Sequence, residues 1–234
     1  IPGSLVTQFQ TSVTYLVACS LIYTGLVQLA FTRFISDRLF EKRKDMVLPN
    51  LHGLLVLVLL GACLLGTAAL FIALPGLGLV YRLLMLAGFT LMCGVWVLTV
   101  LLSGMKRYKA IVLLFGVSYG LIVVSALLMR PWGLEGLLGG FVLGNYVLLV
   151  GMWLLVVREF NPSGPIIAFD FARRAMLYPT LMAIGLLYNL GVWIDKFMFW
   201  YFPPTSDAII GSLRASIIYD LPVFLAYLSI IPGM

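Results

Sequence analysis

Residues 178–204, YPTLMAIGLLYNLGVWIDKFMFWYFPP, decide the fold class. The run is apolar and long enough to cross a bilayer, which takes about 20 residues, yet it contains Asn189, Asp195 and Lys196. A charge within hydrocarbon costs about 2.5–3.5 kcal/mol on the insertion scale, so such residues usually face a bundle interior or a water-filled cavity. Asp195 and Lys196 point about 100° apart on a helix, which makes them poor partners for each other. We therefore expect each to find a partner on another helix or in water.

Two interpretations of this charged pair are open. In the first, Asp195 and Lys196 line a functional cavity. In the second, Asp195 pairs across a packed helix interface while Lys196 extends its ammonium group to the outer headgroups.

The composition of the rest of the chain supports a membrane protein. Of the 234 residues, 62% are hydrophobic and 10% are charged, whereas soluble domains average about 45–50% apolar and about 25% charged residues. A membrane β-barrel would show alternating segments of about 10 residues, and the apolar runs here are longer and continuous. We predict an all-α fold, a polytopic transmembrane helix bundle.

Apolar runs separated by short charged segments predict about seven visible helices. Six are expected to be complete and the seventh, from residue 212, is expected to be truncated. The predicted ranges are 4–32, 51–74, 77–103, 110–129, 137–157, 175–201 and 212 onward.

Lysine and arginine counts in the loops predict the orientation. The six successive connections hold 5, 0, 3, 1, 3 and 0 of these residues, and positive residues remain cytoplasmic. Loops 33–50, 104–109 and 158–174 are therefore expected in the cytoplasm. The first visible helix then enters from outside, which predicts a further helix before Ile1.

Two cytoplasmic segments are candidates for contact with anionic lipid or a protein partner. Segment 33–45, RFISDRLFEKRKD, is typical of an amphipathic helix in the inner interface, although a solvated elbow is an equal alternative. The second segment is the linker 158–174, which is rich in proline and glycine. The candidate contact residues are Arg33, Arg38, Lys42, Arg43, Arg173 and Arg174.

The linker also predicts the domain organisation. It separates an N-terminal transmembrane lobe, 1–157, from the start of a second lobe, 175–234. Many transporters consist of two bundles that move around a central site. Glycines spaced by four residues predict close helix packing, and they occur in two stripes: Gly136, Gly140 and Gly144, and Gly116 and Gly120.

Enzymatic motifs are not found. His52 is the only histidine, and no P-loop, GxSxG or HExxH pattern is present. Nucleic-acid binding has no support, because the basic residues lie in short loops. We predict a protein that is not an enzyme and has no cofactor and no metal.

Polar residues at membrane depth then suggest a substrate path. We predict that it includes Asp195, Lys196, Arg82, Asn189 and Tyr188, with Arg82 and Asp195 at similar outer depth. We expect replacement of Asp195 by Asn to impair passage along this path.

The second half of the chain carries a family resemblance. The stretches FDFARRAMLYPTLMAIGLLYNLGVWIDKFMFW (169–200) and IYDLPVFLAYLSIIPGM (218–234) resemble the PelG family, in the polysaccharide transporter branch of the multidrug/oligosaccharidyl-lipid/polysaccharide superfamily. Asp195 and Lys196 match the Asp-Lys or Asp-Arg pair of that family's seventh helix. The resemblance is close over about sixty residues and loose elsewhere.

The resemblance implies a flippase-like transporter of about twelve helices in two lobes, in the inner membrane of a Gram-negative bacterium. It implies export of a partly cationic, N-acetylgalactosamine- and galactosamine-rich exopolysaccharide (Pel) for the biofilm matrix. It also implies partners similar to the glycosyltransferase PelF and to the membrane subunits PelD and PelE. By this resemblance we expect most of the second lobe to lie outside this sequence, because one lobe alone cannot alternate its access.

Two alternatives remain beside polysaccharide export. One is an exporter of lipid-linked oligosaccharides or drugs within the same superfamily. The other is a membrane scaffold that anchors a cytoplasmic glycosyltransferase. The scaffold predicts that the basic loops matter for polymer synthesis and that Asp195 does not.

Overall fold

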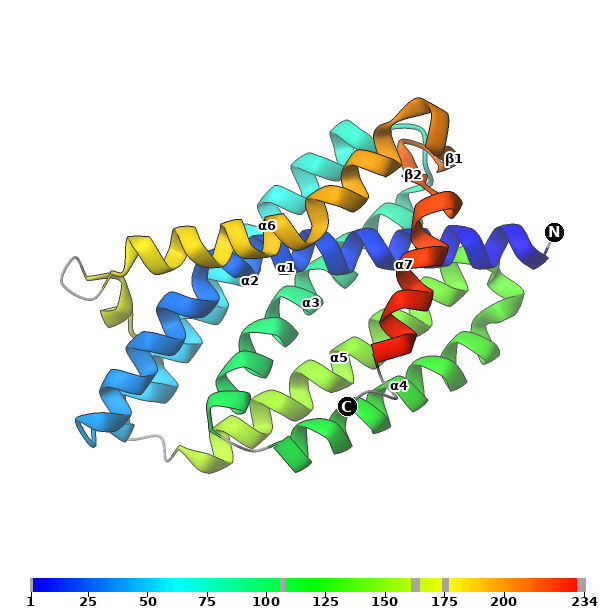
Figure 1. Ribbon diagram of the computed structural model, residues 1–234. Helices are drawn as coiled ribbons and strands as arrows, with labels where there is room; N and C mark the ends of the chain where they lie inside the picture. Colours follow the sequence, from blue (N-terminus) through cyan, green and yellow to red (C-terminus); the bar gives the residue numbers. More distant parts are fainter. Residues whose placement is uncertain (1, 106–107, 161–164, 174–176, 231–234) are drawn as a thin grey trace.

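The computed structural model describes residues 2–105, 108–160, 165–173 and 177–230. Within them it forms seven α-helices and one two-stranded sheet (Figure 1). The helices are α1 (Pro2–Phe40), α2 (Val47–Ala73), α3 (Leu79–Gly104), α4 (Tyr108–Met129), α5 (Gly133–Glu159), α6 (Pro179–Tyr201) and α7 (Ile217–Ile230). The strands are β1 (Asp207–Ile210) and β2 (Leu213–Ala215), and the 3-10 turns are η1 (Lys44–Met46), η2 (Arg130–Trp132), η3 (Asp170–Ala172) and η4 (Pro203–Thr205).

Five helical stretches are long and apolar enough to cross a membrane. One of them, Tyr108–Glu159, contains both α4 and α5, joined by η2. These two helices have 22 and 27 residues, so each alone reaches the roughly 20 residues that a crossing requires. The predicted all-α transmembrane bundle is confirmed.

The helix ends gather at two opposite ends of the bundle. Figure 1 shows the end of α1, the start of α2 and the linker before α6 at one end, called here the inner end. The amino terminus, η2 and the β1–β2 hairpin lie at the other end, called the outer end. The described ends of α1, α3 and α5, which border the predicted basic loops, all lie at the inner end.

The separate interfacial helix predicted for segment 33–45 is wrong, because α1 continues without a break to Phe40. No glycine or proline interrupts residues 33–40, and Arg33 Nε pairs with Asp37 Oδ1 at 3.2 Å one turn later. Phe34 and Ile35 are buried in the bundle core rather than placed against headgroups. The first helix is therefore longer than its apolar run.

The start of the last helix was also predicted wrongly. Residues 213–215, expected in its first turn, form strand β2 of the antiparallel β1–β2 hairpin, and α7 begins at Ile217. Gly211 stands at the turn with φ of 56°, a conformation that glycine adopts without strain. Gly211-Ser212 between two short β-branched and apolar runs is a known hairpin signal, so the sequence did carry a clue.

The start of α6 is set by a proline. The helix was expected from residue 175, and it begins at Pro179. Proline suits the first turn of a helix because its missing N–H would have no partner there. Residues 174–176, which include the predicted contact residue Arg174, lie outside the described part of the chain.

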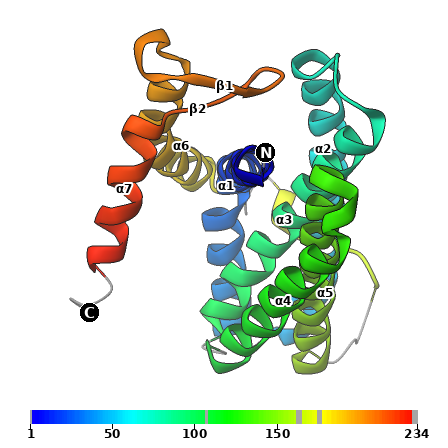
Figure 2. The same ribbon diagram turned by 90° about the vertical axis from the view of Figure 1, so that its right-hand side faces the viewer.

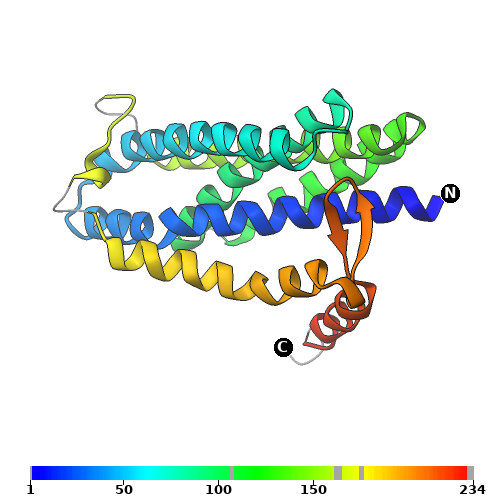
Figure 3. The same cartoon turned by 90° about the horizontal axis from the view of Figure 1, so that it is seen from above.

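Helix α1 joins two groups of elements. Figure 2 shows it between α2–α5 on one side and α6 and α7 on the other, with the hairpin passing over it towards α2. Towards α3, the Ser12 and Tyr81 hydroxyls bond at 2.8 Å and Trp96 Nε1 donates to Ser20 Oγ at 2.9 Å. Towards α6, contact runs along the helix (Figure 3). The position of α6 relative to the remaining bundle therefore depends on α1.

The two glycine stripes behave differently. A Cβ atom on Gly140 would lie 2.6 Å from the Ala126 backbone nitrogen of α4, so the predicted close packing of the first stripe is confirmed. A Cβ atom on Gly116 or Gly120 would have no neighbour within 4 Å among the described residues. The prediction of close packing is wrong for this second stripe, since it faces away from the bundle.

We expect Gly140→Ala to destabilise the protein by about 1–3 kcal/mol, because the added methyl group overlaps main-chain atoms of α4. The matched control is Gly120→Ala, which should gain up to about 1 kcal/mol from the better helix propensity of alanine. Thermal unfolding of both purified variants in the same detergent measures the difference. Equal midpoints for the two variants would contradict the packing of α4 on α5.

Candidate functional site

A groove of about 530 Å³ lies at the outer end, between α1, α6, the hairpin and α7. We call it the outer groove. One wall is the first half of α1, and the facing wall comes from the end of α6 and the start of α7. Elements far apart in sequence thus form one concave surface.

The α1 wall of the outer groove is polar. Thr7, Gln10, Thr11 and Thr14 recur at helical spacing and line the groove. The Thr14 hydroxyl donates to the Gln10 carbonyl at 2.8 Å, so its oxygen lone pairs remain able to accept. A stripe of hydroxyl and amide groups on a transmembrane helix offers hydrogen bonds to a polar substrate. The sequence carries this stripe, but it was not predicted as a site.

Two largely buried aromatic rings form part of the groove lining. Tyr15 and Trp200 stack with ring centroids 4.7 Å apart. The Tyr15 hydroxyl donates to the Arg214 carbonyl at 3.0 Å and lies 3.3 Å from the Arg214 backbone nitrogen. This contact joins α1 to strand β2 and fixes the hairpin beside the groove.

Three charged side chains line the groove, two of them cations. The Asp220 carboxylate accepts from Trp200 Nε1 at 2.9 Å and from the Ser216 backbone nitrogen at 3.2 Å. Arg214 Nε donates to Ser206 Oγ at 2.7 Å. Lys196 Nζ lies 5.0 Å from the centre of the Trp193 ring. The groove therefore has a small net charge, with hydrogen-bonding groups along its α1 wall and the apolar side chains Ile217, Leu221 and Phe224 along its α7 wall.

Of the five residues predicted for the path, Lys196 alone lines this groove. The adjacent Asp195 accepts a hydrogen bond from the Tyr219 hydroxyl and so connects α6 to α7. Arg82 lies over the Phe71 ring at 5.3 Å, and no ion pair joins it to Asp195 in the described part of the chain.

The remaining two predicted residues occupy different faces of α6. Asn189 Nδ2 donates to the Gly185 carbonyl at 2.9 Å and lies against α1 at Gly25. The Tyr188 side chain is 70% exposed. The structure therefore does not gather the five residues into one site.

The candidate contact residues at the inner end are mostly paired. Arg38 is buried and bonds Glu41 Oε2 at 2.7 Å, while Arg173 bonds Asp170 Oδ1 at 2.7 Å. Lys42, at φ of 59°, and Arg43 are exposed on the α1–α2 turn. Basic charge at the inner end is thus partly neutralised by acidic neighbours.

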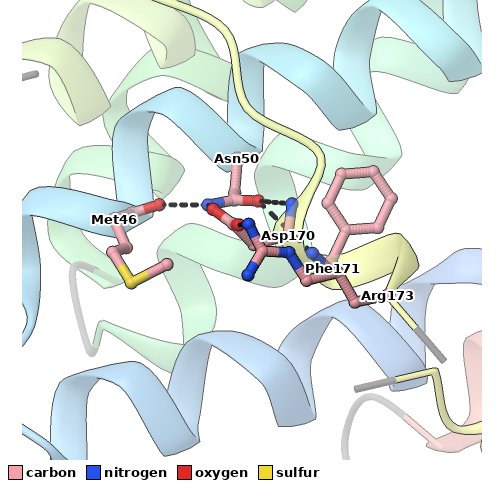
Figure 4. Close-up of polar contacts among 5 residues, drawn as sticks. All are labelled: Met46, Asn50, Asp170, Phe171 and Arg173. Carbon is pink, nitrogen blue, oxygen red and sulfur yellow. Dashed lines mark hydrogen bonds and ion pairs between the residues drawn. The ribbon is translucent and has the colours of Figure 1, made fainter. Parts of the chain in front are cut away.

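The linker is held against the start of α2 by Asn50, which the sequence analysis missed. Asn50 is buried; its Oδ1 accepts from the Asp170 backbone nitrogen at 2.8 Å, and its Nδ2 donates to Met46 O and to Asp170 Oδ2 (Figure 4). A buried polar group needs such partners, because leaving it unpaired costs about 1–3 kcal/mol. The sequence offered one signal for this contact, the single amide side chain of Asn50 at the start of an apolar helix.

Three further contacts fix the same segment. Ala168 N donates to Pro49 O at 3.0 Å, and a Cβ atom on Gly53 would lie 2.1 Å from Ala168 O. His52 Nδ1 lies 2.9 Å from Ile166 O. Residues 165–173 therefore form a docked segment that we call the linker latch.

The inner end also joins α6 to α1 directly. The Tyr178 hydroxyl donates to Asp37 Oδ2 at 2.8 Å. This hydrogen bond to a carboxylate raises the pKa of Tyr178, so the phenol stays protonated as a donor. No group of three or more potential metal ligands occurs among the described residues.

Comparison with known proteins gives one match. The family model PelG, described as an exopolysaccharide exporter (EPS-E), matches residues 1–234. No curated protein and no solved structure matches the chain.

We expect Asn50→Asp to loosen the linker latch, because it places a carboxylate where the Asn50 amide donates to Asp170 at 3.2 Å. Hydrogen exchange of residues 165–173 should rise by about tenfold, the equivalent of about 1.4 kcal/mol. The swap Asn50→Asp with Asp170→Asn should recover part of the protection. An exchange rate that does not change in the single variant would contradict the latch.

Proposed function

Because this chain belongs to the PelG family of exopolysaccharide exporters, we propose that it moves a polysaccharide made on the cytoplasmic side across the bacterial inner membrane. The proposal places the inner end of the bundle in the cytoplasm, in agreement with the lysine and arginine counts of the loops. Polymer then leaves at the outer end. The family is one of transporters, which supports a role other than catalysis.

The observation that carries this proposal is the outer groove. A polysaccharide presents hydroxyl groups and little apolar surface, so its path through a membrane protein needs hydrogen-bonding side chains. Thr11, Thr14 and Gln10 supply them from α1. A path must also bind weakly enough to release the chain, and the groove offers scattered hydrogen bonds rather than a closed cage.

Family resemblance supports the finer parts of the proposal. We take the substrate to be Pel, a partly cationic polymer of N-acetylgalactosamine and galactosamine, and the mechanism to be flippase-like with a second lobe completing the path. Lys196 and Arg214 would weaken the electrostatic attraction between Asp220 and a cationic sugar unit, so that the polymer can leave the groove. Asp195 would act through Tyr219 by holding α7 in place.

Partners belong to the proposal as well. A PelF-like glycosyltransferase and PelD-like and PelE-like subunits would meet the chain at the inner end. Among the candidate contact residues that the structure describes, Arg33, Arg38 and Arg173 form ion pairs, whereas Arg43 and Lys42 are exposed on the α1–α2 turn. Anionic lipid headgroups would reach the same turn.

We expect Gln10→Trp to lower the ratio of secreted to intracellular polymer by tenfold or more, because Gln10 is exposed and lines the groove, which an indole would obstruct. The measurement uses cells with equal membrane levels of each variant. The matched control is Val6→Trp on the same helix, a half-exposed position outside the groove. Secretion by Gln10→Trp equal to that of the control would contradict a path through the groove.

A further inference from the structure

The linker latch presents large apolar side chains at the surface of the protein. Ile166, Ile167 and Phe169 are 79%, 45% and 48% exposed. Their backbone is nevertheless held in place, because Ala168 N between them donates to Pro49 O at 3.0 Å. Exposure of apolar surface to water is unfavourable. A segment that is fixed by hydrogen bonds and keeps three such side chains outward therefore suits an apolar neighbour.

The latch lies at the rim of the bundle, on the side of α2 that faces away from the other helices. His52, whose Nδ1 lies 2.9 Å from Ile166 O, begins a face of α2 that continues with Val56 and Leu60 at four-residue spacing. Those two side chains are 39% and 60% exposed. Figure 3 shows the segment before η3 outside α2, on the side away from α1. The apolar side chains of the latch thus border a surface that a transmembrane helix presents to lipid.

An apolar groove of about 260 Å³ opens beside the latch, between α2, α3 and α5. We call it the rim groove; it is lined by Leu55, Leu59, Leu98, Leu149, Val150 and Trp153. Trp153 stands at its inner end, and its Nε1 donates to His52 Nε2 at 3.1 Å. His52 therefore connects the rim groove to the latch. Tryptophan is common where acyl chains meet headgroups, so this end of the groove has the composition of a membrane boundary.

We propose that the linker latch and the rim groove together form a phospholipid-binding surface, with one acyl chain in the rim groove and the side chains of Ile166, Ile167 and Phe169 inserted where that chain meets its headgroup. Lipid fits better than a soluble protein, because the apolar side chains continue onto the exposed face of a transmembrane helix. The inference goes beyond the proposed function and does not depend on the transported substrate. A phospholipid bound there fixes the linker to the membrane as well as to α2.

One test measures the depth of the latch in a bilayer. The complete chain, with its three cysteines changed to alanine, carries a spin label at Ile166→Cys or, as the matched control, at Asp45→Cys, an exposed polar position of the same end. The purified protein is placed in vesicles of phosphatidylethanolamine and phosphatidylglycerol. We expect the ratio of oxygen to nickel-chelate collisions to be about threefold higher or more at position 166, because insertion by about 5–10 Å excludes the water-soluble chelate. Equal ratios at the two positions overturn the proposal and assign the surface to a cytoplasmic protein.

A second test measures the bound phospholipid itself. Val150→Trp places an indole in the rim groove, and native mass spectrometry of the purified chain detects phospholipid that remains bound. We expect Val150→Trp to lose the phospholipid that the unaltered chain retains. The matched control is Val117→Trp, at an exposed position of α4 outside the groove, which should retain it. Leu59→Trp repeats the test from the α2 wall, and thermal unfolding identifies the variants that are folded. Retention by folded groove variants equal to that of the control overturns the proposal.

Discussion

Helices within lipid gain nothing from hiding apolar side chains from each other, since the surrounding tails are as apolar as leucine. The bundle therefore holds together where residues are small or polar. Gly140 lets α5 approach α4, and Gly25 and Gly185 let α1 approach α6. Between these contacts, Ser12 and Ser20 bond to α3 through Tyr81 and Trp96. These few positions determine how α1 lies against α3 and α6 and how α4 lies against α5, while many large apolar residues elsewhere face outward.

Asp195 and Lys196 are adjacent in the sequence but contact different parts of the structure. A helix directs consecutive residues about 100° apart, and here one meets α7 through Tyr219 while the other borders the outer groove. Their charges therefore act in different places. The carboxylate that lines the groove is that of Asp220, which accepts hydrogen bonds from Trp200 Nε1 and from the Ser216 backbone nitrogen.

Hydropathy predicted the helix bundle, because a membrane-spanning segment must satisfy its backbone hydrogen bonds internally. Lysine and arginine counts predicted which connections lie at the same end of the bundle. The pattern could not tell that Gly140 faces α4 and Gly120 faces outward, since both stripes have the same spacing. Contacts between distant segments, such as Asn50 with Asp170, leave no local pattern. The outer groove was missed for the same reason. The polar residues of α1 form a groove only together with Lys196 and Asp220, which follow them in the sequence by about 180 residues or more.

His52 lies where the linker latch meets α2 and α5, and its two ring nitrogens have opposite roles. Trp153 Nε1 can only donate, and it bonds His52 Nε2 at 3.1 Å, so Nε2 carries no proton. The carbonyl of Ile166 can only accept, so the proton resides on Nδ1, 2.9 Å away. The ring is thereby neutral and fixed as a single tautomer, inferred from its partners. A side chain passed over as a catalytic group thus serves as an oriented connector, receiving a hydrogen bond from one transmembrane helix and giving one to the segment that follows it.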